Sequence, residues 1–172
     1  FYVDYFPRPG KSGGAWMSNY REQQGDIRPL VCNVASFTKP IGDTPSLLTM
    51  DEVETLFHEF GHGLHGLLTK CNYKGTSGTN VVRDFVELPS QINEHWGTEP
   101  EVLKMYAKHY RTGETMPDAL IRKIQESGHF NQGFATVEYV AAALLDMEWY
   151  SNAEVKDFDV NAFEKASMDK YG

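Results

Sequence analysis

Residues 58–62 read His-Glu-Phe-Gly-His, and this spacing constrains the fold of the chain more than any other feature. In an α-helix, residues four apart lie about 40° apart around the axis and about 6 Å apart along it, so His58 and His62 can bind one tetrahedral ion. Glu59 is rotated by about 100° from His58, which suits a metal-held water better than the ion itself. The motif therefore predicts two metal ligands, His58 and His62, and one base, Glu59.

The residues around this motif predict that it lies inside one helix. Thr49-Met50-Asp51-Glu52 has the form of a capping box that begins a helix. Apolar residues follow at helical spacing: Val53, Leu56, Phe57, Phe60, Leu64, Leu67 and Leu68. We expect the helix to end near Lys70, with Asn72 as a left-handed cap. The alternative is an amphipathic helix that carries the two histidines by coincidence.

Three glycines stand within this predicted helix, at Gly61, Gly63 and Gly66. Each costs roughly 0.5–1 kcal/mol in a helix interior relative to alanine. A helix that keeps all three is typical of a backbone that another element approaches closely. We therefore expect a neighbour packed against these glycines.

Composition limits the classes of protein to which the chain can belong. With 172 residues, 41% of them apolar and 13% aromatic, the chain can bury one sizeable core, so we expect a single domain over residues 1–172. A net charge of −8 argues against nucleic acid and anionic membranes as partners. The longest apolar run, residues 140–145, is far shorter than the ~20 residues of a membrane span, and no signal segment opens the chain. Cys32 and Cys71 are predicted to be reduced thiols, which fits a cytoplasmic location and leaves export open.

Strand-like segments precede the motif helix, and helical patterns follow it. Three segments are rich in aromatic and β-branched residues: 1–6, 15–20 and 29–37. We expect them to form a small sheet in which the first two strands pair with each other. The predicted helices cover residues 87–96, 101–111, 116–130 and 132–150, and a last helix begins at Asp159 or Asn161. The fold class is therefore mainly α, of the α+β type, with a small N-terminal sheet followed by a bundle of helices.

Residues 73–80 separate the motif helix from the next predicted helix. Gly75, Gly78 and the small polar residues around them predict a flexible loop rather than packed structure. A flexible loop beside a metal site often controls the entry of substrate. An ordinary surface connection is the alternative.

A catalytic zinc site requires a third protein ligand and an open position. His65 lies about 10 Å further along the helix axis than His58 and is poorly placed for the same ion. Leu68 stands where a metzincin would have its third histidine, which excludes that class. The other histidines lie in separate predicted helices and are more typical of buried or surface residues: His95, His109 and His129. Glu87 begins a second helix after a connection of loop length, as in zincins whose third ligand is glutamate, so we predict it as the third ligand.

Two further carboxylates are candidates for holding the ligands in place. Glu54 stands one turn before His58 and could accept a hydrogen bond from the second nitrogen of that ring. Glu94 shares a helix face with Glu87 and could serve His62 or the surroundings of Glu87 in the same way. For both residues the alternative is a carboxylate in solvent.

The motif at 58–62, followed by Asp84-Phe85-Val86-Glu87-Leu88-Pro89-Ser90-Gln91, is similar to the paired signature of the thimet oligopeptidase family of zinc metallopeptidases. Residues 1–8, 13–16 and 92–96 resemble the bacterial peptidyl-dipeptidases of that family most. The resemblance implies a zincin-like catalytic core of the gluzincin type. It implies one Zn²⁺ per chain bound by His58, His62 and Glu87, with Glu59 as base and with Glu54 and Glu94 as carboxylates around the ligands.

The resemblance also implies an activity on short peptides. We expect a peptidase that releases C-terminal dipeptides by means of a zinc-activated water, and an endo-acting oligopeptidase of the same family is the alternative. Family members carry a glycine-rich segment with Tyr and His downstream of the matched region, whereas this chain begins at Phe1 and ends at Gly172. We therefore expect an internal fragment of a longer peptidase with an incomplete active site. A zinc-bound binding or scaffold module is the alternative from another class.

Overall fold

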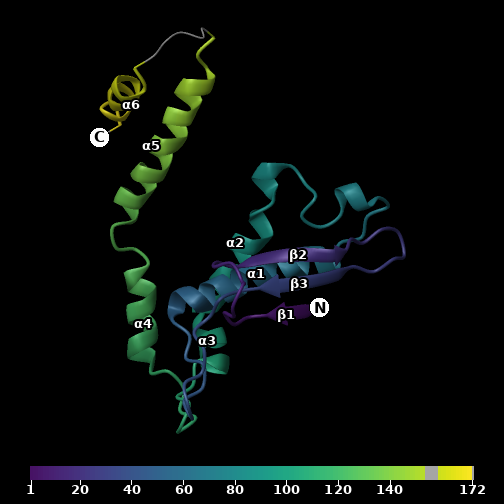
Figure 1. Ribbon diagram of the computed structural model, residues 1–172. Coiled ribbons are helices and arrows are strands. Elements are labelled where there is room, and N and C mark those ends of the chain that lie inside the picture. The colour runs from purple at the N-terminus through teal and green to yellow at the C-terminus, as the bar shows by residue number, and fades with distance from the viewer. Residues whose placement is uncertain (154–158, 172) are drawn as a thin grey trace. The chain divides into compact units, whose positions relative to one another are not determined.

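The computed structural model describes residues 1–153 and 159–171 (Figure 1). They belong to two compact units, Phe1–Ile121 and Arg122–Gly172, and each is described by itself. The fold is mainly helical with one small sheet, which confirms the predicted class. The single-domain organisation expected for residues 1–172 stays a prediction. No helix in the described part of the chain is long and apolar enough to cross a membrane.

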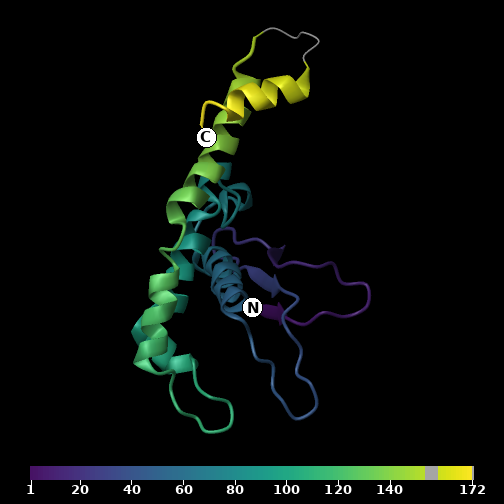
Figure 2. The same ribbon diagram turned by 90° about the vertical axis from the view of Figure 1, so that its left-hand side faces the viewer.

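A three-stranded sheet opens the first unit (Figures 1 and 2). Its strands are β1 (Tyr2–Asp4), β2 (Trp16–Arg21) and β3 (Leu30–Val34). β3 lies in the middle, parallel to β1 and antiparallel to β2, and its residue Asn33 is opposite both Val3 and Met17. The expected pairing of the first two strands is therefore wrong. β3 takes the central place because its inner residues are buried, whereas β1 and β2 are largely exposed edges.

Helix α1 (Met50–Leu68) carries the His-Glu-x-x-His motif and packs against β2 and β3. The predicted capping box is confirmed, because the Thr49 hydroxyl accepts from the Glu52 amide and the Glu52 carboxylate accepts from the Thr49 amide. The same carboxylate accepts from the amide and the hydroxyl of Thr38, at 2.7 and 2.9 Å. These bonds, led by the Thr49 amide, hold the pKa of Glu52 below its usual value. The loop before α1 is thereby fixed to the start of the helix.

The end of α1 differs from the expectation. Thr69 follows the last helical residue with extended backbone, and Asn72 is not left-handed. The guanidinium of Arg28 donates instead to the carbonyls of Leu67 and Thr69. Buried Gln23 then binds both the amide and the carbonyl of Cys71. A left-handed cap is not needed because side chains from the sheet region satisfy these backbone groups.

The three glycines of α1 lie where other elements come closest, as predicted. A Cβ built on Gly61 would lie 2.6 Å from the Cα of Ser90 and 2.8 Å from the carbonyl oxygen of Pro89, both in helix α2 (Leu88–Thr98). A Cβ on Gly66 would lie 2.6 Å from the Met17 side chain on β2. Helix α1 is therefore enclosed between α2 and the sheet.

Helix α2 begins as predicted, with Glu87 as its N-cap residue and Pro89 in its first turn. Helix α3 (Pro100–Tyr106) ends earlier than the predicted residue 111. Residues 107–116 form a turn in which Lys108 pairs with Thr115, and Gly113 adopts a positive φ of 74°. That turn stops the helix because it requires a backbone that only glycine adopts readily.

The loop over 73–80 is packed at one end, unlike the unpacked loop that its composition predicts. Ser77 and Gly78 are buried. Gly78 has a positive φ of 56° and lies against Gly66, because a Cβ on it would be 3.1 Å from the Gly66 Cα. Gly75 is exposed with open space around it. Two glycines that face each other allow the loop to lie directly on α1.

The second unit is helical in its described residues. Helix α4 (Asp118–Ser127) spans the boundary between the units and ends a few residues before the predicted position. Helix α5 (Gln132–Tyr150) has the predicted limits, and Asp159 caps α6 (Val160–Met168) by accepting from the Ala162 amide at 3.1 Å. Trp149 and Phe163 join α5 to α6, with ring centroids 4.1 Å apart.

The substitution Gly61→Ala tests the contact between α1 and α2. We expect it to lower the free energy of unfolding by about 1–3 kcal/mol, because the new methyl group meets helix backbone rather than a movable side chain. Gly63→Ala is the matched control, because a Cβ there meets nothing closer than 3.4 Å and alanine favours the helix by about 1 kcal/mol. Denaturant unfolding of both variants measures the difference. Equal losses of stability would contradict the close approach at Gly61.

Candidate metal centre

Two helices bring three candidate ligand atoms together. Nε2 of His58 and Nε2 of His62, both on α1, lie 3.2 and 3.0 Å from Oε2 of Glu87 at the start of α2. The ligand atoms of these three residues all lie within 4.8 Å of one another. Among the residues that the structure describes, they are the only such group of His, Cys, Asp or Glu.

The arrangement fits a tetrahedral zinc ion. Two ligand atoms that each lie ~2.0–2.1 Å from such an ion are about 3.3 Å apart, which is near the two separations found here. Two imidazoles and one carboxylate are also donors that zinc accepts. These residues can therefore hold a divalent cation such as Zn²⁺.

The geometry depends on how α2 is attached to α1. The Asn93 side chain donates to the carbonyl of Phe57 at 2.7 Å, next to the first histidine of the motif. At Gly61 the two helix backbones are in direct contact through Ser90. These two points fix α2 beside the motif and place Glu87 opposite His58 and His62.

Glu94, rather than Glu54, holds the second nitrogen of His58. Nδ1 of His58 lies 2.5 Å from Oε1 of Glu94. Glu54 is exposed and lies beside the same ring, where it lines a hollow of about 420 Å³ together with Glu59 and Glu94. The docking of α2 decides between them, because it brings Glu94 directly to the ring while Glu54 stays in solvent. The tautomer that donates from Nδ1 to Glu94 is the one that leaves Nε2 of His58 free to act as a ligand.

The charge states of the other two ligands suit a cation. Burial lowers the pKa of His62 below its usual value, although the neighbouring Glu87 carboxylate opposes this, so the ring favours its neutral form. Burial raises the pKa of Glu87, but the hydrogen bond from Ser90 and the imidazoles of His62 and His58 together outweigh it, so the pKa lies below the usual value. The site thus combines a neutral imidazole with an ionised carboxylate.

Glu59 lies beside the cluster and not within it. Its side chain is buried, and its Oε2 atom has no hydrogen-bond partner among the described residues. Burial raises its pKa, and the nearby His58 opposes the shift only in part. Glu59 lines a cavity of about 370 Å³ together with both histidines, Glu87 and the start of β2. Its carboxylate is therefore placed to exchange a proton with a molecule bound in that cavity.

The other histidines lie outside the cluster. His65 contacts the ring of Phe85, with centroids 6.3 Å apart, and burial lowers its pKa. Nδ1 of His109 lies 3.2 Å from the Thr112 hydroxyl in the turn after α3. His95 is on α2, and His129 is in the connection between α4 and α5. None of these residues belongs to the group of converging ligand atoms in the described part of the chain.

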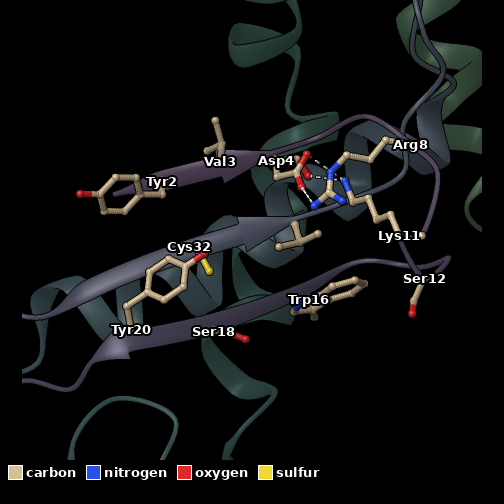
Figure 3. A pocket seen from close by; sticks show the side chains of 12 residues that line it. Tyr2, Val3, Asp4, Arg8, Lys11, Ser12, Trp16, Ser18, Tyr20 and Cys32 are labelled. Carbon is tan, nitrogen blue, oxygen red and sulfur yellow. Dashed lines mark hydrogen bonds and ion pairs between the residues drawn. The ribbon is translucent and has the colours of Figure 1, made fainter.

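A separate hollow of about 440 Å³ lies over the sheet (Figure 3). Its charged residues satisfy one another, because Asp4 binds Arg8 at 2.9 Å and Lys11 at 3.2 Å. These two cations, Arg8 first, hold the pKa of Asp4 below its usual value. The hollow shares only Trp16 with the cavity of the metal cluster. We therefore place the candidate site at the cluster and not over the sheet.

Several residues around the site were not predicted from the sequence. Ala15, Trp16 and Met17, together with Thr79 and Val86, line the cavity beside the metal ligands. Ser90 donates to the carboxylate of Glu87, and Asn93 joins α2 to α1 by donating to the Phe57 carbonyl. A signal for Ser90 does exist, because a serine three residues after a helix N-cap can reach back to it. The cavity residues carry no such local signal.

Comparison with known proteins relates the chain to one peptidase family. The sequence model of peptidase family M3 matches residues 1–171. The chain is 49% identical to the dipeptidyl carboxypeptidase of Escherichia coli (strain K12), over 98% of this chain and 26% of that protein. It is 48% identical to the dipeptidyl carboxypeptidase of Salmonella typhimurium, over 98% of this chain and 25% of that protein. Identity to the oligopeptidase A of Escherichia coli is 39%, over 88% of this chain and 23% of that protein.

These relatives are much longer than the chain, which spans about a quarter of the length of those it matches. The predicted resemblance to the thimet oligopeptidase family is confirmed, and the identities to dipeptidyl carboxypeptidases exceed that to oligopeptidase A. Because the family model covers nearly every residue, the chain belongs to peptidase family M3.

Proposed function

We propose that the protein is a zinc-dependent peptidase that releases dipeptides from the C-termini of short peptides. The observation that carries this proposal is the convergence of His58, His62 and Glu87 beside the buried carboxylate of Glu59. The relatives named dipeptidyl carboxypeptidase favour the release of dipeptides. An endo-acting oligopeptidase is the second candidate, and the match to oligopeptidase A favours it.

The donor set defines what the cofactor contributes. His58, His62 and Glu87 would hold a Zn²⁺ ion, which would act as a Lewis acid toward the scissile carbonyl and would lower the pKa of the attacking water toward neutrality. Burial favours the neutral imidazole of His62, and the surroundings of Glu87 favour its ionised carboxylate, so both groups suit a cation. The half-exposed side of Glu87 leaves room for substrate next to the site.

Glu59 acts as the proton carrier. Its carboxylate accepts a proton from the attacking water and delivers it to the leaving amine. Burial raises the pKa of Glu59, which makes the carboxylate a better proton acceptor than an exposed glutamate. The unpartnered Oε2 atom leaves one oxygen free for this exchange.

The sheet offers a place for an extended peptide. β2 is an edge strand, because β3 pairs with it on one side only. Trp16 and Met17, at the start of β2, and the preceding Ala15 line the same cavity as Glu59 and His58. An extended peptide that adds to this edge through main-chain hydrogen bonds would pass the candidate metal centre.

Replacing Glu59 by Gln tests the assignment of the base. We expect kcat to fall by about 10²–10⁴-fold while zinc content stays unchanged, because the residue carries protons but does not bind the ion. Peptide hydrolysis and elemental analysis of the complete protein provide the two measurements. Glu101→Gln, in the first turn of α3, is the control for loss of a carboxylate. Full peptidase activity in Glu59→Gln would sink the assignment.

The two carboxylates near His58 can be separated by paired substitutions. We expect Glu94→Gln to weaken zinc binding by about 10–100-fold, because it removes the charged acceptor from Nδ1 of His58. Glu54→Gln should leave the zinc dissociation constant unchanged, because that side chain is in solvent. Competition with a chromophoric chelator measures both constants. A larger effect from Glu54→Gln would reverse the roles given to the two residues.

The position of cleavage is tested with a substrate in two forms. A peptide with a free C-terminal carboxylate should lose a dipeptide. The same peptide with a C-terminal amide should be hydrolysed at least about 100-fold more slowly. The reason is that a site that releases C-terminal dipeptides must bind the terminal carboxylate. Mass spectrometry of the products identifies the bond that is cut. Equal cleavage of both forms supports the endo-acting oligopeptidase.

A further inference from the structure

Ser90 lies at the centre of the contact between α1 and α2. It is fully buried, and its backbone meets Gly61 of α1. Its hydroxyl oxygen lies 2.8 Å from Oε2 of Glu87 and 2.8 Å from the carbonyl oxygen of the same residue. Both acceptors of this single hydroxyl proton therefore belong to one candidate ligand.

The oxygen that Ser90 contacts is the one that faces the histidines. Oε2 of Glu87 lies 3.2 Å from Nε2 of His58 and 3.0 Å from Nε2 of His62. The Glu87 side chain is 50% exposed, so solvent competes for its carboxylate. A glutamate in that setting can turn away from the cluster unless a buried group restrains it.

We propose that Ser90 is a positioning residue that holds Oε2 of Glu87 toward the two histidines and thereby sets the affinity of the site for zinc. This inference rests on the zinc site of the proposed function. The hydroxyl occupies one lone pair of Oε2 and leaves the other directed at the ligand nitrogens. Ser90, the partner of Glu87, therefore lies on α2, and so does Glu94, the partner of His58.

A structural role for Ser90 makes different predictions. A serine in the first turn of a helix can satisfy its hydroxyl with the carbonyl three residues earlier, and a small residue is needed where Gly61 approaches. In that case removal of the hydroxyl changes the stability of the protein without zinc. It does not change the affinity of the folded protein for zinc.

The test is the zinc dissociation constant of Ser90→Ala in the complete protein, measured by chelator competition. We expect it to rise by about 10–100-fold, because the hydroxyl no longer holds Oε2 of Glu87 toward the histidines. Ser77→Ala, at a buried serine of the 73–80 loop, is the matched control and should leave the constant as it is. An unchanged zinc dissociation constant in Ser90→Ala overturns the inference, whether or not the melting temperature of the zinc-free variant falls.

A double-mutant cycle shows whether Ser90 acts through Glu87. In a Glu87→Ala background, where zinc binds to the histidines alone, Ser90→Ala should have no further effect on the zinc dissociation constant. An equal loss of affinity in both backgrounds overturns the inference. Failure of the wild-type protein to bind zinc defeats the proposed function itself, whereas tight binding that Ser90→Ala does not alter defeats only the role of Ser90.

Discussion

The candidate site depends on the contact between α1 and α2 at Gly61. A side chain at this position would overlap the backbone of Ser90 and Pro89, so only glycine allows the two helices to approach this far. Glu87 lies three residues before Ser90 and Glu94 four residues after it. The contact point therefore sits between the carboxylate that faces both histidines and the carboxylate that holds His58. One missing Cβ atom sets both distances, and the helix propensity lost at Gly61 is the cost of this geometry.

The site also contains two buried polar atoms that have no partner in the described part of the protein. Oε2 of Glu59 and Nδ1 of His62 are both in this state. Burying a polar group without a hydrogen bond costs roughly 1–3 kcal/mol, so such groups are kept where chemistry requires them. Glu59 has a reason to be unpartnered if its oxygen exchanges protons with a molecule in the adjacent cavity. The amide of Asn33, buried beneath Gly63, is unpartnered too, and nothing in the site uses it.

The residues that the sequence predicts well are those whose signal is local. The spacing of His58 and His62 and the capping box at Thr49 and Glu52 depend only on helix geometry, and the structure has that helix with that cap. The choice of Glu94 over Glu54 depends on where α2 crosses α1, which helical periodicity does not contain. The order of the strands failed for the same reason, because the central place of β3 follows from burial by distant residues. The predicted cap at Asn72 was wrong because Arg28, far away in sequence, binds the final carbonyls of α1.

The site residues are divided between two helices, and this explains why a site of this kind is built on helices rather than loops. α1 carries His58, Glu59 and His62, and α2 with its N-cap residue carries Glu87, Ser90 and Glu94. Within each segment the spacing is fixed by backbone hydrogen bonds, so the relative position of the two helices is the main variable left. The contact at Gly61 and the hydrogen bond from Asn93 to Phe57 fix that variable at two points. A change at either point moves Glu87 and Glu94 together. The distances from the two histidines to Glu87 and the orientation of the His58 ring must therefore change at the same time.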